Sequence, residues 1–428
     1  MDRSRRIFLL LGLCWALPWL AVAQEDASSW THFRGSGLNG MAAGGGFPLS
    51  WNDSTNISWK IPVEGKGWSS PVVMDQQIWL TTASREKKEM RALCLDYHTG
   101  REIHNLLVFK PDTFFRIHAI NSYATPTPAL EEGFVYVHFG RYGTACLNSR
   151  TGDKVWERTD LTCEHIQGPG SSLVIYKDKL IVHLEGTDVQ WILALDKRTG
   201  KTLWRTERPA EIWDRMPEIG KKAYITPIII QAQGRDLMIS NGSAACIAYD
   251  PETGKEVWRI IQGDDSTISM PVEGDGRIFF YTSFVTGEDG RKYAELFAVN
   301  PNGQGDIGES HILWRMKAPV LQLSTPVVVN GFLYTIDSRG VFYRIRSRDG
   351  EVNWSENLKG KFHSSPLYAD GHVFVSSTHG ETLVYQAGPV PELVSTNVLE
   401  GEIWATPALV NGAILMRTSE FLYKIERK

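Results

Sequence analysis

One short phrase recurs along the chain, with an Asp or Asn, a Thr-Gly pair and a Trp at fixed spacing. Its clearest copies run from Ala194 to Trp204, from Ala248 to Trp258 and from Cys146 to Trp156. The Asp or Asn can accept backbone N–H bonds at the start of a tight turn, and the Gly can supply the positive φ that closes it. Because apolar residues alternate on both sides, each copy predicts a β-hairpin.

The Trp that ends each copy would bury a large flat ring against the neighbouring repeat. Weaker copies run from Cys94 to His104, from Ala298 to Trp314 and from Ile345 to Trp354, and His104 replaces the Trp in the first of them. The predicted docking residues are Trp59, Trp156, Trp204, Trp258, Trp314 and Trp354.

A second phrase, which ends in Pro and leads into an apolar strand, precedes the hairpins. Its copies begin at Trp68, Tyr123, Tyr224, Ile268, Leu323, His363 and Trp404, and a further copy, without its Pro at the same place, begins at Gly170. Eight units over the 405 residues that follow position 23 give about 50 residues each, the size of a four-stranded propeller blade. The predicted fold is all-β, an eight-bladed β-propeller of four-stranded antiparallel blades.

The two ends of the chain complement each other. The last unit, from Trp404 to Ile425, supplies only three strands, whereas residues 56–62 look like a single outer strand. We expect this N-terminal strand to join the C-terminal blade, because a closed ring leaves no exposed sheet edge. The predicted organisation is a signal peptide over residues 1–23 and one propeller over 24–428, with a loop and closing strand over 24–60.

The first residues have the pattern of an export signal. Arg3, Arg5 and Arg6 precede an apolar run over residues 7–20, and the Ala-Val-Ala of residues 21–23 is a small-x-small cleavage site. The paired arginines also fit a twin-arginine signal, so both export routes stay open. We expect a periplasmic or secreted protein. The apolar run is shorter than the roughly 20 residues that span a bilayer, so we expect no membrane insertion.

Charge and cysteine usage exclude two kinds of partner. The formal net charge is -4, without long runs of one sign, which argues against a nucleic-acid partner. Beyond the leader, Cys94, Cys146, Cys163 and Cys246 form neither a C-x-x-C pair nor an adjacent pair. We therefore expect them to be small core residues, and we expect no metal site.

The repeated hairpin phrase resembles the tryptophan-docking motif of the pyrroloquinoline-quinone-like (PQQ-like) β-propeller repeat superfamily. Residues 30–35 (Trp-Thr-His-Phe-Arg-Gly) and 51–71 are also similar to the beginning of exported bacterial members. In character the chain is closest to outer-membrane-assembly-factor-like propellers of uncharacterised function. The resemblance implies the fold but no single function, because the superfamily includes quinoprotein dehydrogenases as well as an assembly propeller.

In a propeller, the loops from one blade's outer strand to the next blade's inner strand open on one face, around the central channel. Here the loops over residues 105–123, 158–169 and 206–224 are long, and we expect the binding site on their face. In five blades the Pro-ending phrase begins with an aromatic residue or His. A ring of such residues could stack on a planar ligand or hold an extended peptide, and the alternative is packing between blades. The five are Trp68, Tyr123, Tyr224, His363 and Trp404.

Polar side chains in the same loops could bind an anionic ligand, and the alternative is that they are solvated loop charges. They are Arg116, His118, Asn121, Glu164, His165, Arg215 and Lys222, with Lys66 and Lys361 ahead of two inner strands. Glu164 and His165 form the best acid–base pair by composition, but adjacency in sequence does not place two side chains on one proton. We assign no catalytic residue.

Two functions of different classes follow. The first is an exported, non-catalytic binding or scaffold propeller without a cofactor, which binds a peptide, protein or polymer on its loop face, as a monomer or within a larger envelope assembly. The alternative, implied by the resemblance, is a quinoprotein dehydrogenase that oxidises an alcohol or sugar with PQQ and calcium. That branch often carries a disulfide between adjacent cysteines and long catalytic insertions, and this sequence has neither. We therefore favour the binding propeller.

Overall fold

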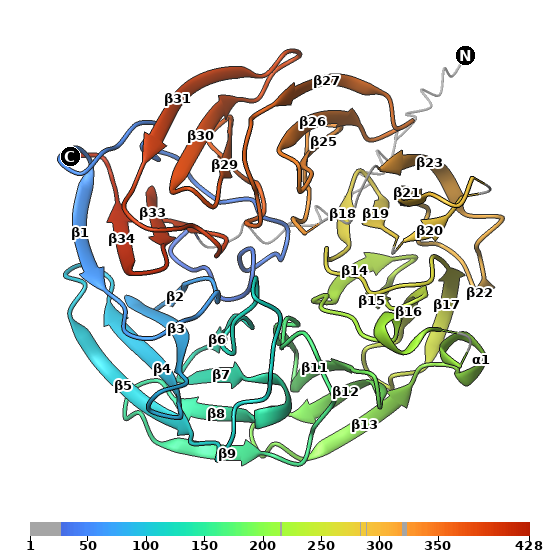
Figure 1. Cartoon of the computed structure of the whole chain (residues 1–428), viewed down its shortest axis with the longest axis horizontal. Helices are drawn as coiled ribbons and strands as arrows, with labels where there is room; N and C mark the ends of the chain where they lie inside the picture. The colour runs from blue at the N-terminus through green and yellow to red at the C-terminus, as the bar shows by residue number, and fades with distance from the viewer. Residues whose placement is uncertain (1–26, 215, 283, 288, 319–322) are drawn as a thin grey trace, which may run out of the picture.

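Eight antiparallel four-stranded sheets, two of them extended by a short extra strand, surround a central axis in the computed structural model (Figure 1). The structure describes residues 27–214, 216–282, 284–287, 289–318 and 323–428. The predicted signal peptide lies outside these residues. The sheets follow one another around the ring in chain order, so the predicted eight-bladed propeller is confirmed.

Each blade is built from four consecutive strands, except where β20 and β22 intervene in blade 5 and where β1 joins blade 8. Blade 1 contains β2 (Val72–Met74), β3 (Gln77–Ser84), β4 (Glu89–Asp96) and β5 (Glu102–Phe109), and blade 2 contains β6 (Ala129–Glu131), β7 (Phe134–His138), β8 (Thr144–Asn148) and β9 (Lys154–Arg158). Blade 3 contains β10 (Val174–Tyr176), β11 (Lys179–Glu185), β12 (Gln190–Asp196) and β13 (Thr202–Glu207), and blade 4 contains β14 (Ile228–Ala232), β15 (Arg235–Gly242), β16 (Ala245–Tyr249) and β17 (Glu256–Ile261). Blade 5 contains β18 (Val272–Gly274), β19 (Arg277–Tyr281), β21 (Lys292–Val299) and β23 (Ile312–Ala318), and blade 6 contains β24 (Val327–Val329), β25 (Phe332–Ile336), β26 (Val341–Arg346) and β27 (Val352–Asn357). Blade 7 contains β28 (Leu367–Ala369), β29 (His372–Ser376), β30 (Glu381–Gln386) and β31 (Glu392–Val398), and blade 8 contains β32 (Ala408–Val410), β33 (Ala413–Arg417), β34 (Phe421–Ile425) and β1 (Ile57–Pro62).

The two ends of the chain close the ring. β1 pairs antiparallel with β34, and the register places Ile61 opposite Leu422. Lys60 of β1 also forms an ion pair with Glu400. The N-terminal strand therefore completes the C-terminal blade, as the sequence predicts.

The repeated hairpin attaches each blade to the next through its Trp. The indole N–H of Trp156 donates to the main-chain oxygen of Lys197, in the turn of the next blade, at 2.9 Å. A Cβ added to Gly200 of that turn would lie 2.7 Å from the Trp156 ring, so the turn needs glycine for space as well as for its φ of +70°. Trp59, Trp204, Trp258 and Trp314 donate to the next blade in the same way, and Trp354 packs edge-on against Tyr385.

Two cysteines and a histidine occupy variant positions of this hairpin. His104 replaces the Trp in blade 1, and its Nε2 lies 3.1 Å from the main-chain oxygen of Arg150 in the next blade. Cys94 lies opposite His104, and Cys146 lies opposite Trp156, where other hairpins have Ala. The cysteines described by the structure are buried and free. Cys94 and Cys146 serve as small residues opposite the docking side chains.

Hydrogen bonds also link the inner strands around the channel. The Ser70 N–H donates to the Thr127 hydroxyl of the next blade at 3.0 Å. The same bond recurs from Thr127 to Ser172, from Ser172 to Thr226, from Met270 to Thr325, from Thr325 to Ser365 and from Ser365 to Thr406. An inner strand is a sheet edge, so its N–H groups need acceptors outside the sheet. The hydroxyl of the Pro-ending phrase supplies one.

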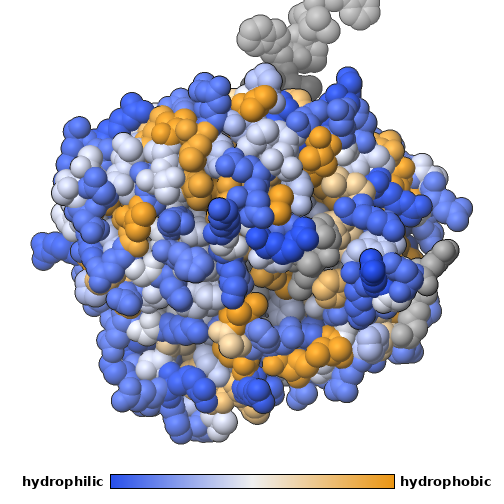
Figure 2. All heavy atoms as spheres, turned by 45° about the horizontal axis from the view of Figure 1, so that its top comes forward, coloured by the Kyte–Doolittle hydropathy of each residue, from blue (hydrophilic) through white to orange (hydrophobic). Residues whose placement is uncertain are grey.

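Buried apolar clusters lie between neighbouring blades, such as the cluster that joins β2–β4 to β6–β8. Short elements outside the repeat are β20 (Val285–Thr286), β22 (Gly305–Asp306), α1 (Ala210–Trp213) and two single 3-10 turns (Gly140–Tyr142 and Glu218–Gly220). Figure 2 shows a face that is mostly hydrophilic, with separate hydrophobic patches. Within the described part of the chain, no helix has the length and apolar character needed to cross a bilayer.

Candidate binding site at the channel mouth

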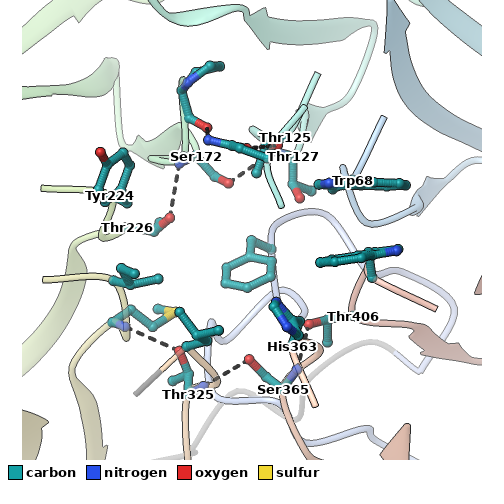
Figure 3. A pocket seen from close by; sticks show the side chains of 18 of the residues that line it. Trp68, Thr125, Thr127, Ser172, Tyr224, Thr226, Thr325, His363, Ser365 and Thr406 are labelled. Carbon is teal, nitrogen blue, oxygen red and sulfur yellow. Dashed lines mark hydrogen bonds between the residues drawn. The ribbon is translucent and has the colours of Figure 1, made fainter. Parts of the chain in front are cut away.

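A cavity of about 360 Å³, the mouth cavity, opens where the inner strands begin. Every blade contributes the first residue of its Pro-ending phrase to the lining (Figure 3). These residues are Trp68, Thr125, Gly170, Tyr224, Ile268, Leu323, His363 and Trp404. Two positions further along each strand, the linking hydroxyl groups also line the cavity in most blades. The described lining is therefore aromatic, apolar and hydroxyl-bearing.

An aromatic wall stands on one side of the mouth cavity. The rings of Trp68 and Trp404 stack with centroids 5.2 Å apart and planes 11° from parallel, and His363 meets Trp404 edge-on at 4.5 Å. Both indoles are anchored, because Trp68 donates to the main-chain oxygen of Ile120 and Trp404 donates to Glu402 Oε2. The wall is thus formed before any ligand arrives.

His363 and Tyr224 are both held uncharged at neutral pH. Burial, helped by the nearby Lys361 charge, lowers the pKa of His363 to about 4. Burial also raises the pKa of Tyr224 far above its usual range. The Tyr224 hydroxyl donates to Gln167 Oε1 at 2.9 Å. Neither His363 nor Tyr224 therefore brings a formal charge to the cavity.

Tyr123 does not belong to this ring, so the sequence-based register of blade 2 was wrong by two residues. Two prolines follow it, and β6 begins after Pro128 rather than after Pro126. Thr125 consequently takes the place at the mouth cavity. Tyr123 is buried beside the long loop before β6, where its hydroxyl donates to the main-chain oxygen of Phe115.

The segment that precedes β1 crosses the ring and forms part of the floor of the cavity, which sequence reasoning missed. It is bonded to inner strands across the ring, since Thr31 accepts from Leu130 of blade 2 and Arg34 donates to the main-chain oxygens of Pro326 and Pro366. Phe33, between them, lines the cavity. We call the mouth cavity, together with this crossing segment, the funnel. The Trp-Thr-His-Phe-Arg-Gly phrase of residues 30–35 lies outside the repeat, and it was the sequence feature that could have indicated a role for this segment.

Arg34 lies fully buried beneath this floor. It has no exposed surface, and its guanidinium donates to four main-chain oxygens, of Asn39, Thr325, Pro326 and Pro366. Burial lowers its pKa to about 9. The two Nη atoms make all four bonds, whereas the buried Nε has no partner among the described residues, so it is the Nη bonds by which Arg34 fixes the segment under the funnel.

The predicted loop residues separate into two groups. Arg116 and His118 are exposed, and His118 reaches the mouth cavity. Glu164 is also exposed, with its carboxylate 4.0 Å from Arg141. His165, in contrast, is buried against Tyr224, with 5.5 Å between ring centroids.

Glu164 and His165 therefore do not form an acid–base pair, because one side chain faces solvent and the other faces the core. Asn121 is half-buried at the mouth cavity, and Lys222 is buried. Lys66 and Lys361 are exposed beside the aromatic wall. Arg215 lies outside the described residues.

A sequence profile described as "Outer membrane protein assembly factor BamB" matches residues 41–166, 188–303 and 306–387, which is most of the chain. The chain belongs to this family. The BamB match and the propeller geometry together confirm the predicted PQQ-like repeat superfamily.

Curated relatives fall on both branches of that superfamily. The outer membrane protein assembly factor BamB of Moranella endobia is 25% identical over 233 residues, which cover 48% of this chain and 56% of that protein. The quinohemoprotein alcohol dehydrogenase ADH-IIG of Pseudomonas putida is 25% identical over 232 residues, which cover 48% of this chain and 30% of the dehydrogenase. The match thus spans just over half of the Moranella endobia protein and less than a third of the dehydrogenase.

Solved structures with a similar fold likewise include both BamB and quinohemoprotein alcohol dehydrogenases. BamB from Moraxella catarrhalis has a TM-score of 0.59 at 13% identity and covers 86% of this chain and 99% of its own. The quinohemoprotein alcohol dehydrogenase of Comamonas testosteroni has a TM-score of 0.67 at 14% identity, covering 95% of this chain and 81% of its own. At these identities the likeness to the BamB family and to the dehydrogenases shows the fold alone.

The residues of this BamB-family chain do not fit a calcium-bound quinone at the channel mouth. Calcium prefers carboxylate and carbonyl oxygens, and the quinone's acid groups need cationic donors. The described lining of the mouth cavity contains no Asp, Glu, Lys or Arg. Across the part of the chain that the structure describes, no three His, Cys, Asp or Glu side chains gather as a metal site requires.

Proposed function

We propose that this chain is an exported, non-catalytic binding propeller that holds an extended segment of an envelope protein or polymer at its channel mouth. Membership of the BamB family supports the class, and the arginine-led pattern of the first residues supports export. The observation that carries the proposal is the anchored aromatic wall of Trp68, Trp404 and His363 in the lining of the mouth cavity.

The shape of the mouth cavity suits side chains of a bound segment. Its volume of about 360 Å³ lies near the low end of the roughly 300–1,000 Å³ typical of ligand pockets. Because Trp68 and Trp404 are already fixed by hydrogen bonds, they lose little conformational entropy on binding. Indole rings that present a large apolar face are typical anchors of protein interfaces.

The test is capture from a periplasmic extract by the immobilised protein, compared with its Trp68→Ala plus Trp404→Ala variant. We expect the variant to lose the captured proteins or polymers, by at least about tenfold in yield, because the aromatic wall supplies most of the buried apolar contact. Leu203→Ala is the matched control, since Leu203 is 47% exposed on the outer strand β13, away from the mouth cavity. Identical captured sets for wild type and the double variant would refute the proposal.

A further inference from the structure

A second cavity of about 600 Å³, the side cavity, adjoins the mouth cavity on the loop face. His118 and Asn121 line both cavities, so a single stretch of loop separates them. Asn121 Nδ2 holds this stretch in place by donating to the main-chain oxygens of Gln167 and Pro169, at 2.8 and 3.0 Å. The two cavities therefore adjoin each other across this fixed stretch of loop.

Three cationic side chains line the side cavity: Lys66, Arg85 and Arg116. The described lining contains no Asp or Glu, and no described carboxylate lies within ion-pair distance of these three. Lys66 Nζ lies 4.9 Å from the ring centre of Trp68, so the cationic group begins where the aromatic wall ends.

Two of the carboxylates near these cations in the sequence have other partners. Glu64 forms an ion pair with Lys87, and Glu89 forms one with Arg91. Three positive charges around one cavity make its electrostatic potential positive. A bound anion would be stabilised there by charge-assisted hydrogen bonds.

The loop that carries Arg116 has a defined shape. The Phe114 ring packs against Tyr123 with centroids 4.4 Å apart, and the Phe115 N–H donates to the Tyr142 hydroxyl at 2.9 Å. Arg141 lies over the Phe115 ring at 3.8 Å. The guanidinium of Arg116 therefore extends from an anchored backbone.

We propose that the bound segment is a peptide with two neighbouring features, an apolar or aromatic side chain in the mouth cavity and a carboxylate among Lys66, Arg85 and Arg116. This inference rests on the proposed function and specifies its ligand. A peptide fits better than a nucleic acid, because nucleic acids need a basic stripe along a whole face and this chain is acidic overall. The carboxylate belongs either to an Asp or Glu side chain or to the end of a chain.

The experiment is selection of random peptides displayed on phage, carried out with the purified protein. Selections use wild type, Arg85→Glu plus Arg116→Glu, Trp68→Ala plus Trp404→Ala, and Arg150→Glu. Arg150 is an exposed residue in the β8–β9 turn, at the end of the blade opposite the loop face, and provides the matched charge control.

Wild type and the Arg150→Glu variant should both enrich peptides with an apolar residue close to Asp or Glu, or close to a free chain end. The arginine variant should keep the apolar preference and lose the acidic one. Selected peptides with no acidic preference, or with the same preference in the arginine variant, would overturn this inference and leave the proposed function standing. Failure to enrich any peptide that depends on Trp68 and Trp404 would instead count against the proposed function.

Synthetic versions of a selected peptide distinguish the two sources of the carboxylate. Amidation of the chain end tests the terminal carboxylate, and replacement of Asp by Asn tests the side chain. Whichever change removes the bound group should weaken binding, measured by fluorescence anisotropy, by roughly tenfold, the usual effect of losing a hydrogen bond to a charged group. No change with either peptide would overturn the assignment.

Discussion

Buried histidines govern how the propeller responds to acid. Burial lowers the pKa of His32 and His138 to about 4, and burial together with neighbouring cationic and imidazole groups lowers that of His165 to about 3. In an unfolded chain each would titrate near pKa 6.5. Below about pH 6.5 the unfolded state binds protons that the folded state does not, so the free energy of unfolding falls as the pH falls.

Substitution of His165 by Phe should remove one of these titrations and keep an aromatic ring against Tyr224. Between about pH 5 and 7, the free energy of unfolding should then depend less steeply on pH, by up to about one proton. Urea titrations at several pH values measure this slope. His98→Gln, at an exposed position, is the control for the loss of a histidine from the chain. A slope identical to wild type in H165F would mean that His165 does not stay neutral in the fold.

At the scale of the element, the hairpin turn and the Trp of the preceding blade form one joint. Gly254 has a φ of +71°, and an added Cβ would lie 2.5 Å from the Trp204 ring. Gly276 has nearly the same φ, +69°, and a Cβ there would meet nothing within 4 Å. Gly254 is needed both for its positive φ and for the space that the docked Trp204 ring occupies, whereas Gly276 is needed only for its positive φ.

Gly254→Ala should therefore destabilise the fold more than Gly276→Ala. Both variants place Ala at positive φ, which costs about 1–2 kcal/mol, and only the first also displaces the indole, at about 1–3 kcal/mol more. Urea denaturation gives the two free energies of unfolding. Equal losses would show that the Trp ring moves aside freely and that docking contributes little.

For the whole molecule, the chemistry of the funnel separates the two functions that the fold allows. A dehydrogenase would need carboxylates for calcium and cations for the quinone's acid groups, and the described lining of the mouth cavity offers neither. The side cavity has the cations but no described carboxylate.

Mixing purified protein with PQQ and calcium should accordingly give no saturable change in absorbance. A panel of alcohols and sugars should give no dye reduction above the level of the free quinone. The Comamonas testosteroni quinohemoprotein alcohol dehydrogenase, assayed in parallel, serves as the positive control. Saturable binding with turnover would reverse our ranking of the two functions.

The amino-acid sequence by itself determined the repeat, and with it the blades and the closing strand. The Asp-to-Gly turn and the alternating strands depend on hydrogen bonds and sterics within a few residues, so they can be read locally. The same local reading misplaced Tyr123, because two prolines in succession offer two possible strand starts and only pairing with β7 selects one.

Only the tertiary structure decided which residues meet at the site. Trp68 and Trp404 belong to blades 1 and 8 and stack because the ring closes between those blades. Phe33 reaches the funnel because Arg34 fixes its segment to distant inner strands. Arg85 and Arg116 belong to two different loops and line the same side cavity. Such contacts depend on how the blades pack around the axis, and no short stretch of sequence specifies that packing.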